Sequence, residues 1–434
     1  MADGTEAPVR AQAAWRNWSG SVTASPRAML APKNEEELSA AIRDAPAPLR
    51  IMGAGHSFTP LVASQGTILD LAAFSGLRAQ DATQMQATFG AATPLSSLTR
   101  LLSGIGQALP NMGDIDRQTM AGALGTATHG SGMQLGAYHT QLTAMRLVDG
   151  RGGLQEYHAD TDQEMIHATG VTLGAFGALT AITLQNIPAY SLRRRRIAVP
   201  LGDILADFES ALSAHRSAEL FIVPFASHAL LQTLDITDAP SIPRATEKDE
   251  DALTTLKALR TWLKWFPRAR RALIGSAMAR VADEEIAGAW RDVYASDRQT
   301  RFNEMEYHLP LEEGPKAIRQ IIDLTEKHFP EVYFPMEIRT VQADDFWLSP
   351  FYRRQTCSVA VHHDASEDPS AFFGAAEAVF KRFGGRPHWG KAHSLRAQEL
   401  CALYPRFGDA MEVRRALDPD NRFVSRYMAG LFGL

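Results

Sequence analysis

Cysteine is scarce in this sequence: its 434 residues include only Cys357 and Cys401. Two cysteines are too few for a disulfide framework, and no C-x-x-C pair provides a metal-binding spacing, so a reducing cytoplasm is the expected location. A continuous apolar run of about 18 residues, which a transmembrane helix requires, is also missing. The start, MADGTEAPVRAQAAW, lacks the basic opening and apolar core of a signal peptide. We therefore expect a cytoplasmic protein.

A strong net charge is missing as well. The value of −5 gives the chain as a whole no attraction to nucleic acid or anionic lipid, so neither a nucleic acid nor a membrane is an expected partner, and no obligate protein partner is evident. The G-x-S-x-G elbow, the P-loop and the H-E-x-x-H motif are absent, which disfavours α/β-hydrolases, P-loop enzymes and zinc proteases. Without such motifs we expect no metal at the remaining candidates, His362, His363, His388 and His393.

The length and composition favour a soluble α+β protein with two domains. A chain of 434 residues exceeds the size at which one hydrophobic core keeps growing. Residues 31–45 contain PKNEEELSAAIRDA, where Leu38, Ala41 and Ile42 have helical spacing and Asn34 is a suitable N-cap. Short strand patterns alternate with helices from there on, and we place a domain boundary near Tyr190.

Two basic segments have alternative interpretations. The four arginines in SLRRRRIAVP could bind an anion, but solvent-facing arginines on a strand are the simpler interpretation, because no aromatic platform accompanies them. Residues 247–290 mix Trp262, Trp265 and Phe266 with arginines and lysines. This segment either packs on the core of the second domain, which we favour, or docks as an amphipathic helix on a membrane surface.

Three glycine-rich stretches indicate a large anionic cofactor. They are GAGHS at 53–57, NMGDID with AGALGTATHGSG within 111–132, and TLGAFGALTAIT at 172–183. Glycines let backbone amides approach a pyrophosphate, and Thr126, Thr128, Ser131 and Thr180 add hydroxyl donors. The first stretch is not a dinucleotide fingerprint, because Phe58 stands where the third glycine belongs. Any one stretch alone could equally be a tight turn.

The ordered motifs GAGHSFTP, LPNMGDIDRQTMAGALGTATHGSG, TLGAFGALTAIT, FPMEIRTVQADDFWLSP and GGRPHWGKAHS resemble the sugar-lactone and alditol oxidase family of the vanillyl-alcohol-oxidase flavoproteins. WRNWSG near the start and ALYPRF and LDPDNRF near the end extend the resemblance over nearly the whole chain, and it is weakest at 200–300. It implies a two-domain vanillyl-alcohol-oxidase-type FAD-binding fold with a sheet-based cap. Residues 1–190, completed by 388–434, are then expected to bind FAD, and residues 191–387 to form the substrate-binding cap domain.

The resemblance implies that His56 is bonded covalently to the 8α-methyl of FAD. The alternative interpretation is that His56 is a loop histidine that caps a nearby carbonyl and has no covalent link. Gly113 falls where family members that react well with oxygen often have glycine. Together with the glycine-rich stretches, the resemblance predicts the following cofactor-binding residues: Gly53, Ala54, Gly55, His56, Ser57, Gly113, Asp114, Gly122, Gly125, Thr126, Thr128, His129, Gly130, Ser131, Gly177, Thr180 and Lys391.

The predicted catalytic residues are Glu337, Arg339, Lys391 and His362. Glu337 and Arg339 lie two apart on an expected strand, so both point to one face and offer a hydroxylated substrate an acceptor and a fork of donors. A surface ion pair is the alternative for these two. Lys391 resembles the family lysine near flavin N1, whereas His388 and Trp389 are expected to shape their loop.

One departure concerns the substrate. Alditol oxidases have a histidine and, two places later, a threonine where a gapless comparison puts Ala360 and His362, and SVAVHHD is closer to lactone-type members. This departure weighs against a linear polyol. His362 becomes a candidate acid or base, with a buried structural histidine as the alternative. The expected reaction is oxidation of a sugar lactone, polyol or related carbinol, with O2 reduced to H2O2. A dehydrogenase that uses a quinone or cytochrome, and a non-catalytic carbohydrate- or membrane-binding protein, are the alternatives.

Overall fold

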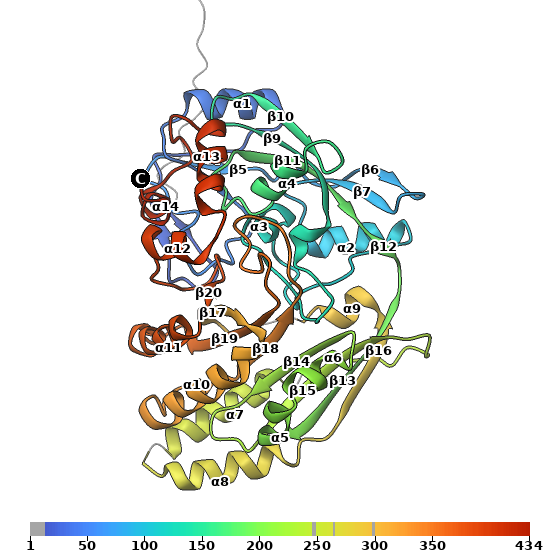
Figure 1. The fold of residues 1–434 in the computed structure, drawn as a ribbon, viewed down its shortest axis with the longest axis vertical. Helices are drawn as coiled ribbons and strands as arrows, with labels where there is room; N and C mark the ends of the chain where they lie inside the picture. Colours follow the sequence, from blue (N-terminus) through green and yellow to red (C-terminus); the bar gives the residue numbers. More distant parts are fainter. Residues whose placement is uncertain (1–13, 245–248, 264, 297–299) are drawn as a thin grey trace, which may run out of the picture.

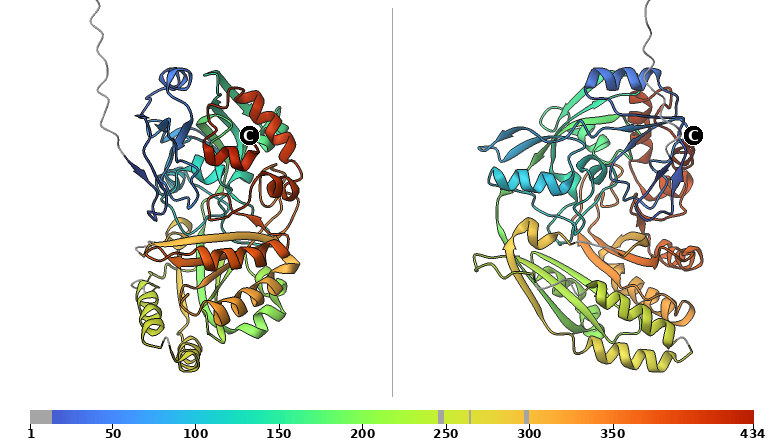
Figure 2. Two further views of the ribbon diagram at one scale, coloured as in Figure 1. Left: turned by 90° about the vertical axis from the view of Figure 1, so that its left-hand side faces the viewer. Right: turned by 180° about the vertical axis from the view of Figure 1, so that it is seen from behind.

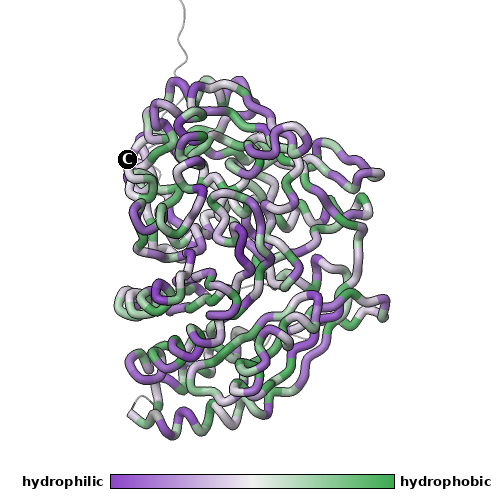
Figure 3. The backbone as a smooth tube through the Cα atoms, viewed as in Figure 1, coloured by the Kyte–Doolittle hydropathy of each residue, from purple (hydrophilic) through white to green (hydrophobic). Residues whose placement is uncertain are grey.

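The computed structural model describes residues 14–244, 249–263, 265–296 and 300–434. These residues form two lobes (Figure 1), and residues 14–190 and 388–434 meet in the upper one. One buried hydrophobic cluster extends from Leu61 to Phe432 and includes residues of both lobes. Hydrophobic segments accordingly run through both lobes in Figure 3.

The upper lobe contains two larger sheets. The first is parallel, with the strand order β3 (Ala28–Leu30), β5 (Thr67–Asp70) and β4 (Leu49–Met52). The second is antiparallel, with the strand order β10 (Leu154–His158), β9 (Leu142–Val148), β11 (Ala178–Gln185), β7 (Gln86–Gly90) and β6 (Leu77–Asp81). Two short pairs accompany them: β1 (Trp15–Arg16) with β2 (Thr23–Ala24), and β8 (Gln107–Ala108) with β12 (Ile187–Pro188).

Helices of the upper lobe come from both ends of the chain. They are α1 (Glu35–Asp44), α2 (Leu95–Gly104), α3 (Met120–Gly125), α4 (Gln163–Thr169), α12 (Ala397–Leu403), α13 (Phe407–Leu417) and α14 (Arg426–Phe432), with a 3-10 turn at Tyr138–Gln141. The helix expected near residues 31–45 is confirmed as α1. The side chain of Asn34 accepts a hydrogen bond from the Glu37 amide at 2.8 Å, and Leu38 and Ile42 are buried.

The lower lobe is built on an eight-stranded sheet. Its strand order is β16 (Glu284–Ala289), β13 (Ser191–Pro200), β15 (His228–Ile236), β14 (Ser217–Ile222), β18 (Met336–Val341), β19 (Thr356–Asp364), β17 (Phe302–Pro310) and β20 (Arg386–Pro387). Its helices are α5 (Leu201–Ala206), α6 (Phe208–Ser213), α7 (Asp249–Trp262), α8 (Pro267–Met278), α9 (Trp290–Tyr294), α10 (Gly314–His328) and α11 (Ser370–Arg382), with a 3-10 turn at Leu311–Glu313. Figure 2 shows α10 and α11 side by side, where they contact β19 and β17 respectively.

The arginine run in β13 corrects one expectation. Arg195 is solvent-facing as predicted, but Arg194 is buried and donates to Glu284 at 2.6 Å. The cause is the neighbouring strand β16, whose Glu284 and Glu285 pair in register with Arg196 and Arg195. Cross-strand pairs of opposite charge therefore account for the run without an anionic ligand.

Buried Arg50, in β4 of the upper lobe, joins three parts of the chain. Its guanidinium donates to the carbonyl of Gly174 at 2.9 Å and to that of Phe423 at 2.6 Å, and also to the carbonyls of Leu61 and Leu173. Nearby, the amide of Leu49 donates to the carbonyl of Arg422. Strand β4 is thus hydrogen-bonded directly both to the C-terminal segment and to the loop before β11. In the described parts of the chain, no helix has both the length and the apolar composition needed to cross a membrane.

Candidate active site

A glycine-lined cavity lies in the upper lobe. It measures about 960 Å³, including the part open to solvent, and every residue that lines it comes from positions 15–179. The predicted cofactor residues found in this lining are Gly53, Ala54, Gly55, His56, Ser57, Gly122, Gly125, Thr126 and Gly177. The three glycine-rich stretches therefore meet around a single cavity.

Glycines in these stretches let other groups come close to the backbone. A Cβ at Gly53 would stand 2.8 Å from the hydroxyl oxygen of Thr119, and Gly177 has a φ of +131°, which L side chains rarely adopt. Among larger side chains, the lining also offers several glycines and the hydroxyl-bearing residues Ser57 and Thr126. Such a cradle fits the pyrophosphate and ribityl parts of FAD.

A second cavity of about 620 Å³, including its solvent-open part, adjoins the first. His56, Ser57, Gln118 and Thr126 line both. The second cavity adds polar residues from the lower lobe and from the loop after β20. Among the predicted site residues, it contains Gly113, Asp114, Thr128, His129, Arg339 and Lys391. A cofactor bound in the first cavity would thus reach charged side chains in the second.

His56 stands at the junction of the two cavities. Its ring stacks on Trp18, with the ring centroids 5.5 Å apart and the planes inclined by 21°. Burial, assisted by the positive charges of Lys391 and Arg117, lowers the pKa of His56 to about 4. The imidazole is therefore neutral at pH 7 and keeps a lone pair, as a nucleophile must.

Arg339 is the buried centre of a carboxylate cluster. It is 8% exposed, pairs directly with Glu337, and lies 3.5 Å from a carboxylate oxygen of Glu219 and 3.6 Å from one of Asp114. Burial alone lowers the pKa of the guanidinium, but these carboxylates outweigh burial and raise it well above its usual value. The surface ion pair considered as the alternative for Glu337 and Arg339 is thus excluded. Only Arg339 of the two lines the second cavity.

Lys391 forms a second charged group with two residues of the lower sheet. Its ammonium pairs with Glu304, whose other carboxylate oxygen lies 3.7 Å from Nε2 of His362. Nδ1 of His362 faces the carbonyl of Pro335 at 2.9 Å. Because a carbonyl only accepts, Nδ1 of His362 is the donor in this contact. His362 itself does not line either cavity.

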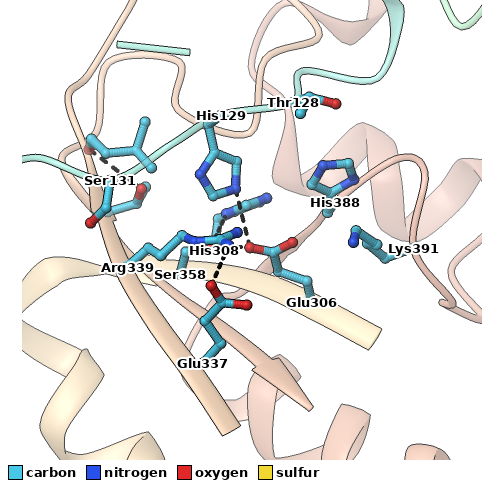
Figure 4. A network of polar contacts seen from close by, with 12 residues as sticks. Thr128, His129, Ser131, Glu306, His308, Glu337, Arg339, Ser358, His388 and Lys391 are labelled. Atoms are coloured by element: carbon cyan, nitrogen blue, oxygen red, sulfur yellow. Dashed lines mark hydrogen bonds and ion pairs between the residues drawn. The ribbon is translucent and has the colours of Figure 1, made fainter. Parts of the chain in front are cut away.

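A chain of buried hydrogen bonds lies behind the second cavity (Figure 4). His129 contacts the carbonyl of Gly130 through Nδ1 at 2.7 Å and Oε1 of Glu306 through Nε2 at 3.1 Å. Ser358 donates to the same carboxylate oxygen at 2.7 Å and contacts Nδ1 of His308 at 2.8 Å. All five residues are buried.

The two hydrogen-bond acceptors that His129 contacts determine which of its ring nitrogens carry protons. The Gly130 carbonyl and the Glu306 carboxylate only accept, so His129 donates from both ring nitrogens and carries a positive charge. Burial by itself raises the pKa of the Glu306 carboxyl group, but the charge and hydrogen bond of His129 outweigh burial and hold this pKa well below its usual value. His129 and Glu306 are therefore a buried ion pair.

His129, Glu306 and His308 are also close enough together to hold a metal ion. The histidines considered from the sequence as metal candidates, including His362 and His388, do not belong to this group. Nδ1 of His388 instead accepts from the Gly390 amide at 3.0 Å. The hydrogen bonds described above explain why His129 and Glu306 lie so close together, and no metal ion is needed for this.

Several predicted residues lie away from both cavities. Ser131 donates to the carbonyl of Ala218, and Thr180 donates to Glu35 at 2.6 Å. A Cβ at Gly130 would meet the carbonyl of Met112 at 2.4 Å, so this glycine permits close backbone packing. The structure thus uses these three positions in contacts between elements. The Trp389 indole likewise donates to the Leu348 carbonyl at 2.7 Å, which fits the loop-shaping role expected for it.

Sequence reasoning missed Glu304, Glu306 and His308. They occupy alternate positions of β17, FNEMEYHLP, and are all buried. Alternate residues of a strand share one face, so three ionisable groups at this spacing in one short strand were the available signal. Their partners His129 and Lys391 come from remote parts of the chain, which is why the signal alone could not identify their role.

The ion pair of His129 and Glu306 leads to a prediction about stability. Because the pKa of Glu306 is lowered by folding, its charge stabilises the protein above the pKa of an unfolded glutamate, about 4.3, and this contribution is lost as the pH falls through the folded-state value. Glu306→Gln is expected to lower the free energy of unfolding at pH 7 by about 3 kcal/mol, as for other buried pairs that lose one charge. Urea unfolding at several pH values measures the difference, which should shrink below about pH 4.

The matched control is Glu412→Gln at an exposed position of α13. Its effect is expected to stay within about 0.5 kcal/mol at every pH. Equal stability of Glu306→Gln and the wild type at pH 7 would contradict the ion pair.

Comparisons with known proteins extend what the geometry indicates. A family model described as FAD binding domain matches residues 26–157, and one described as D-arabinono-1,4-lactone oxidase matches residues 182–431. L-gulono-1,4-lactone dehydrogenase of Mycobacterium tuberculosis is 31% identical over 430 residues, covering 96% of this chain and 99% of the relative. Alditol oxidase of a Streptomyces species is 26% identical and covers 96% and 98%.

L-gulonolactone oxidase of Scyliorhinus torazame is 27% identical over 442 residues, covering 96% of this chain and 98% of the relative. Among solved structures, cholesterol oxidase from Brevibacterium sterolicum superposes with a TM-score of 0.77 at 17% identity, covering 96% of each chain. At that identity the superposition speaks for the fold alone.

The fold, the cavities and these matches define an FAD-dependent oxidoreductase that acts on CH–OH donors. Within that class, the chain belongs to the D-arabinono-1,4-lactone oxidase family. The family resemblance, the vanillyl-alcohol-oxidase-type fold and the enzyme class predicted from the sequence are thereby confirmed. Membership in an enzyme family also disfavours the non-catalytic alternative.

Proposed function

We propose that this chain is an FAD-dependent oxidase of a sugar lactone, polyol or related substrate. When bound, FAD would supply N5 as the acceptor of a hydride from the carbinol carbon, and the two electrons would then pass to O2 to give H2O2. The observation that carries the proposal is the junction at His56, where the glycine-lined cavity opens beside Arg339 and Lys391. Cofactor and substrate sites are typically pockets in which a few polar groups converge on an otherwise apolar or backbone lining.

We assign residues 1–190, with 388–434, to FAD binding and residues 191–387 to the substrate-binding cap. Two observations support this division. All residues lining the first cavity precede position 190. The second cavity adds residues of β17 and β18 from the lower lobe, together with the His388–Lys391 loop.

We further propose that FAD is attached covalently through His56. The residues that would hold it are the glycines and hydroxyl side chains of the first cavity. Two features of His56 support the attachment: its place between the cavities and its neutral imidazole, whose pKa is about 4. The neighbouring Trp18 ring holds the imidazole in one orientation, which favours a single site of attack.

Arg339 and Lys391 would bind the substrate oxygens and balance negative charge that develops on them. The proton of the substrate hydroxyl would pass to Glu337 or His362. A sugar lactone is the preferred substrate class, in agreement with the departure from alditol oxidases at Ala360 and His362.

Two measurements on the holoenzyme test this function. Anaerobic mixing with lactones, polyols and sugars should bleach the flavin spectrum with at least one of these classes. Under air, each molecule of that substrate should then yield one molecule of H2O2. Bleaching without peroxide, combined with turnover on an artificial acceptor, would instead support a dehydrogenase, the second candidate function, which is favoured by the name of the 31% identical relative.

Gly113 provides a sharper test of the oxygen reaction. A Cβ there would meet one described neighbour, the carbonyl oxygen of His129 at 3.2 Å, so alanine fits after a shift of a few tenths of an ångström. Gly113→Ala is expected to slow reoxidation by O2 about tenfold, equivalent to about 1.4 kcal/mol in barrier height. Stopped-flow spectroscopy separates reoxidation from anaerobic reduction by substrate, which should stay nearly unchanged.

Gly374→Ala, in α11, is the matched control, because a Cβ there has no neighbour within 4 Å in the described structure. Unchanged reoxidation in Gly113→Ala would remove Gly113 from the oxygen pathway, and the proposal for that residue would then be wrong.

A further inference from the structure

The end of α7, the turn after it and helix α8 expose several large apolar side chains. Trp262 is 78% exposed, Trp265 82%, Phe266 63% and Leu273 52%. We call these four residues the hairpin patch. Single exposed apolar residues are common on soluble proteins, but a group of this kind marks an interaction site. Nothing in the proposed reaction uses the patch, since neither cavity contains any of the four.

Helix α8 is fixed to the protein by only one of its faces. Arg270, Ile274 and Met278 recur every four residues and are buried, and Ile274 and Met278 pack in a cluster with Val223 and Phe225. The guanidinium of Arg270 also lies 4.1 Å from the centre of the Phe225 ring. The exposed residues of α8 are Arg268, Ala269, Arg271, Ala272, Leu273, Ser276 and Ala277. The outer face of α8 therefore combines the large apolar side chain of Leu273 and several small residues with two arginines.

The charge of this segment is opposite to that of the whole chain. Residues 252–282, ALTTLKALRTWLKWFPRARRALIGSAMARVA, contain seven lysines and arginines and no acidic residue, whereas the complete chain has a net charge of −5. Some of these cations are neutralised by acids of other elements, such as Lys257 by Asp364 at 2.8 Å and Arg260 by Glu367 at 2.8 Å. Arg268 and Arg280 are exposed and form no ion pair within the described residues. Positive charge therefore borders the hairpin patch.

We propose that the hairpin patch and the outer face of α8 dock on the surface of an anionic lipid bilayer. Tryptophan and phenylalanine insert at the boundary between headgroups and acyl chains, and arginines beside them bind lipid phosphates. The position of α8 agrees with this occupant: in Figure 1 it forms the outer edge of the lower lobe, farthest from α1. A protruding helical edge can enter a flat bilayer surface without any complementary groove on the other side.

Vesicle binding by the holoenzyme tests the proposal. Wild-type protein is expected to sediment with vesicles of phosphatidylcholine and phosphatidylserine in equal parts, and much less with phosphatidylcholine alone. Its tryptophan emission should shift to shorter wavelength on binding. Raising the salt concentration should weaken the binding, because exposed charges are screened.

Two variants separate the contributions. The triple variant Trp262→Ser, Trp265→Ser and Phe266→Ser should lose binding and the emission shift. The double variant Arg268→Glu with Arg280→Glu should weaken binding to the anionic vesicles by more than about tenfold, given the contribution of each basic side chain near such a surface. Both should retain the flavin spectrum and turnover in the absence of vesicles, since neither cavity is touched.

The controls carry the same chemical changes on other surfaces. Met29→Ser, Leu154→Ser and Ile236→Ser remove exposed apolar side chains elsewhere, and Arg78→Glu with Arg151→Glu reverses two exposed charges. These controls should bind vesicles like the wild type. Failure of the wild type to bind either vesicle, or equal loss in variants and controls, would overturn the proposal. So would a wild-type dimer that the triple aromatic variant converts to a monomer, because the patch would then be occupied by a second copy.

Discussion

Replacing Arg339 with lysine is expected to lower kcat/KM by about 10²-fold, and replacing it with alanine by at least about 10³-fold. The reason is the convergence of Glu337, Glu219 and Asp114 on one buried guanidinium. Lysine restores the charge but not the planar fork that reaches several carboxylates at once, so the geometry presented to the substrate changes. Steady-state kinetics on the best substrate of the anaerobic screen measures both variants.

The two variants also differ in their expected stability. Alanine removes the cation shared by the buried carboxylates of Glu337 and Glu219 and the partly exposed one of Asp114, which should cost about 3–5 kcal/mol in the free energy of unfolding. Arg339→Lys is therefore the decisive variant for catalysis, because it retains a cation and is expected to fold. The control is Arg195→Lys, a change in an exposed ion pair of the same sheet. Wild-type kcat/KM in Arg339→Lys would show that the fork plays no part in the reaction.

A His56→Ala variant is expected to lose every trace of covalently bound flavin. Acid precipitation of the wild type should leave the yellow colour in the protein pellet, and a denaturing gel should show a fluorescent flavin band. The variant should release its flavin into the supernatant and show no such band. His158→Ala, at an exposed histidine, should behave like the wild type. A wild-type protein that releases all its flavin would contradict the covalent link.

The attachment should also depend on pH in a defined direction. Because burial and nearby cations lower the pKa of His56 to about 4, its imidazole is neutral above that pH and protonated below it. Incubating flavin-free protein with FAD should therefore give covalent product at pH 5 to 8 at similar yield, with the yield falling only near pH 4. A fall centred near pH 6.5, the ordinary value for histidine, would show that His56 is not in the environment described here.

Local features of the fold could be predicted where neighbouring residues decide them. Asn34 and the three acidic residues after it specify the start of α1, and the glycine-rich stretches specify close backbone approach whatever the rest of the chain does. The order of the eight-stranded sheet could not be predicted in this way. The strand β17, for example, pairs with both β19 and β20, and nothing in its own sequence selects these distant partners.

In the candidate site, too, contacts between neighbouring residues could be predicted and contacts between distant residues could not. Glu337 and Arg339 could be predicted to share a face because they are two apart on a strand, and the structure places them in one ion pair. The third and fourth members of that cluster, Glu219 and Asp114, come from β14 and from the loop before α3, so only the folded chain brings them together. Whether Glu337 and Arg339 form a surface pair or a buried pair could not be predicted either, because burial depends on the whole fold.

The hydrogen bonds of Arg50 bear on the order in which this protein can be made. The guanidinium reaches the carbonyl of Phe423, and the amide of Leu49 reaches that of Arg422, although the loop that follows β4 forms part of the cofactor cavity. Residues near position 50 therefore acquire these neighbours only after residues 422 and 423 have been synthesised. A nascent chain that stops short of Arg422 lacks two of the hydrogen bonds that hold β4 beside the first cavity, so tight binding of FAD in that cavity, as proposed, is expected only after the C-terminal segment has docked.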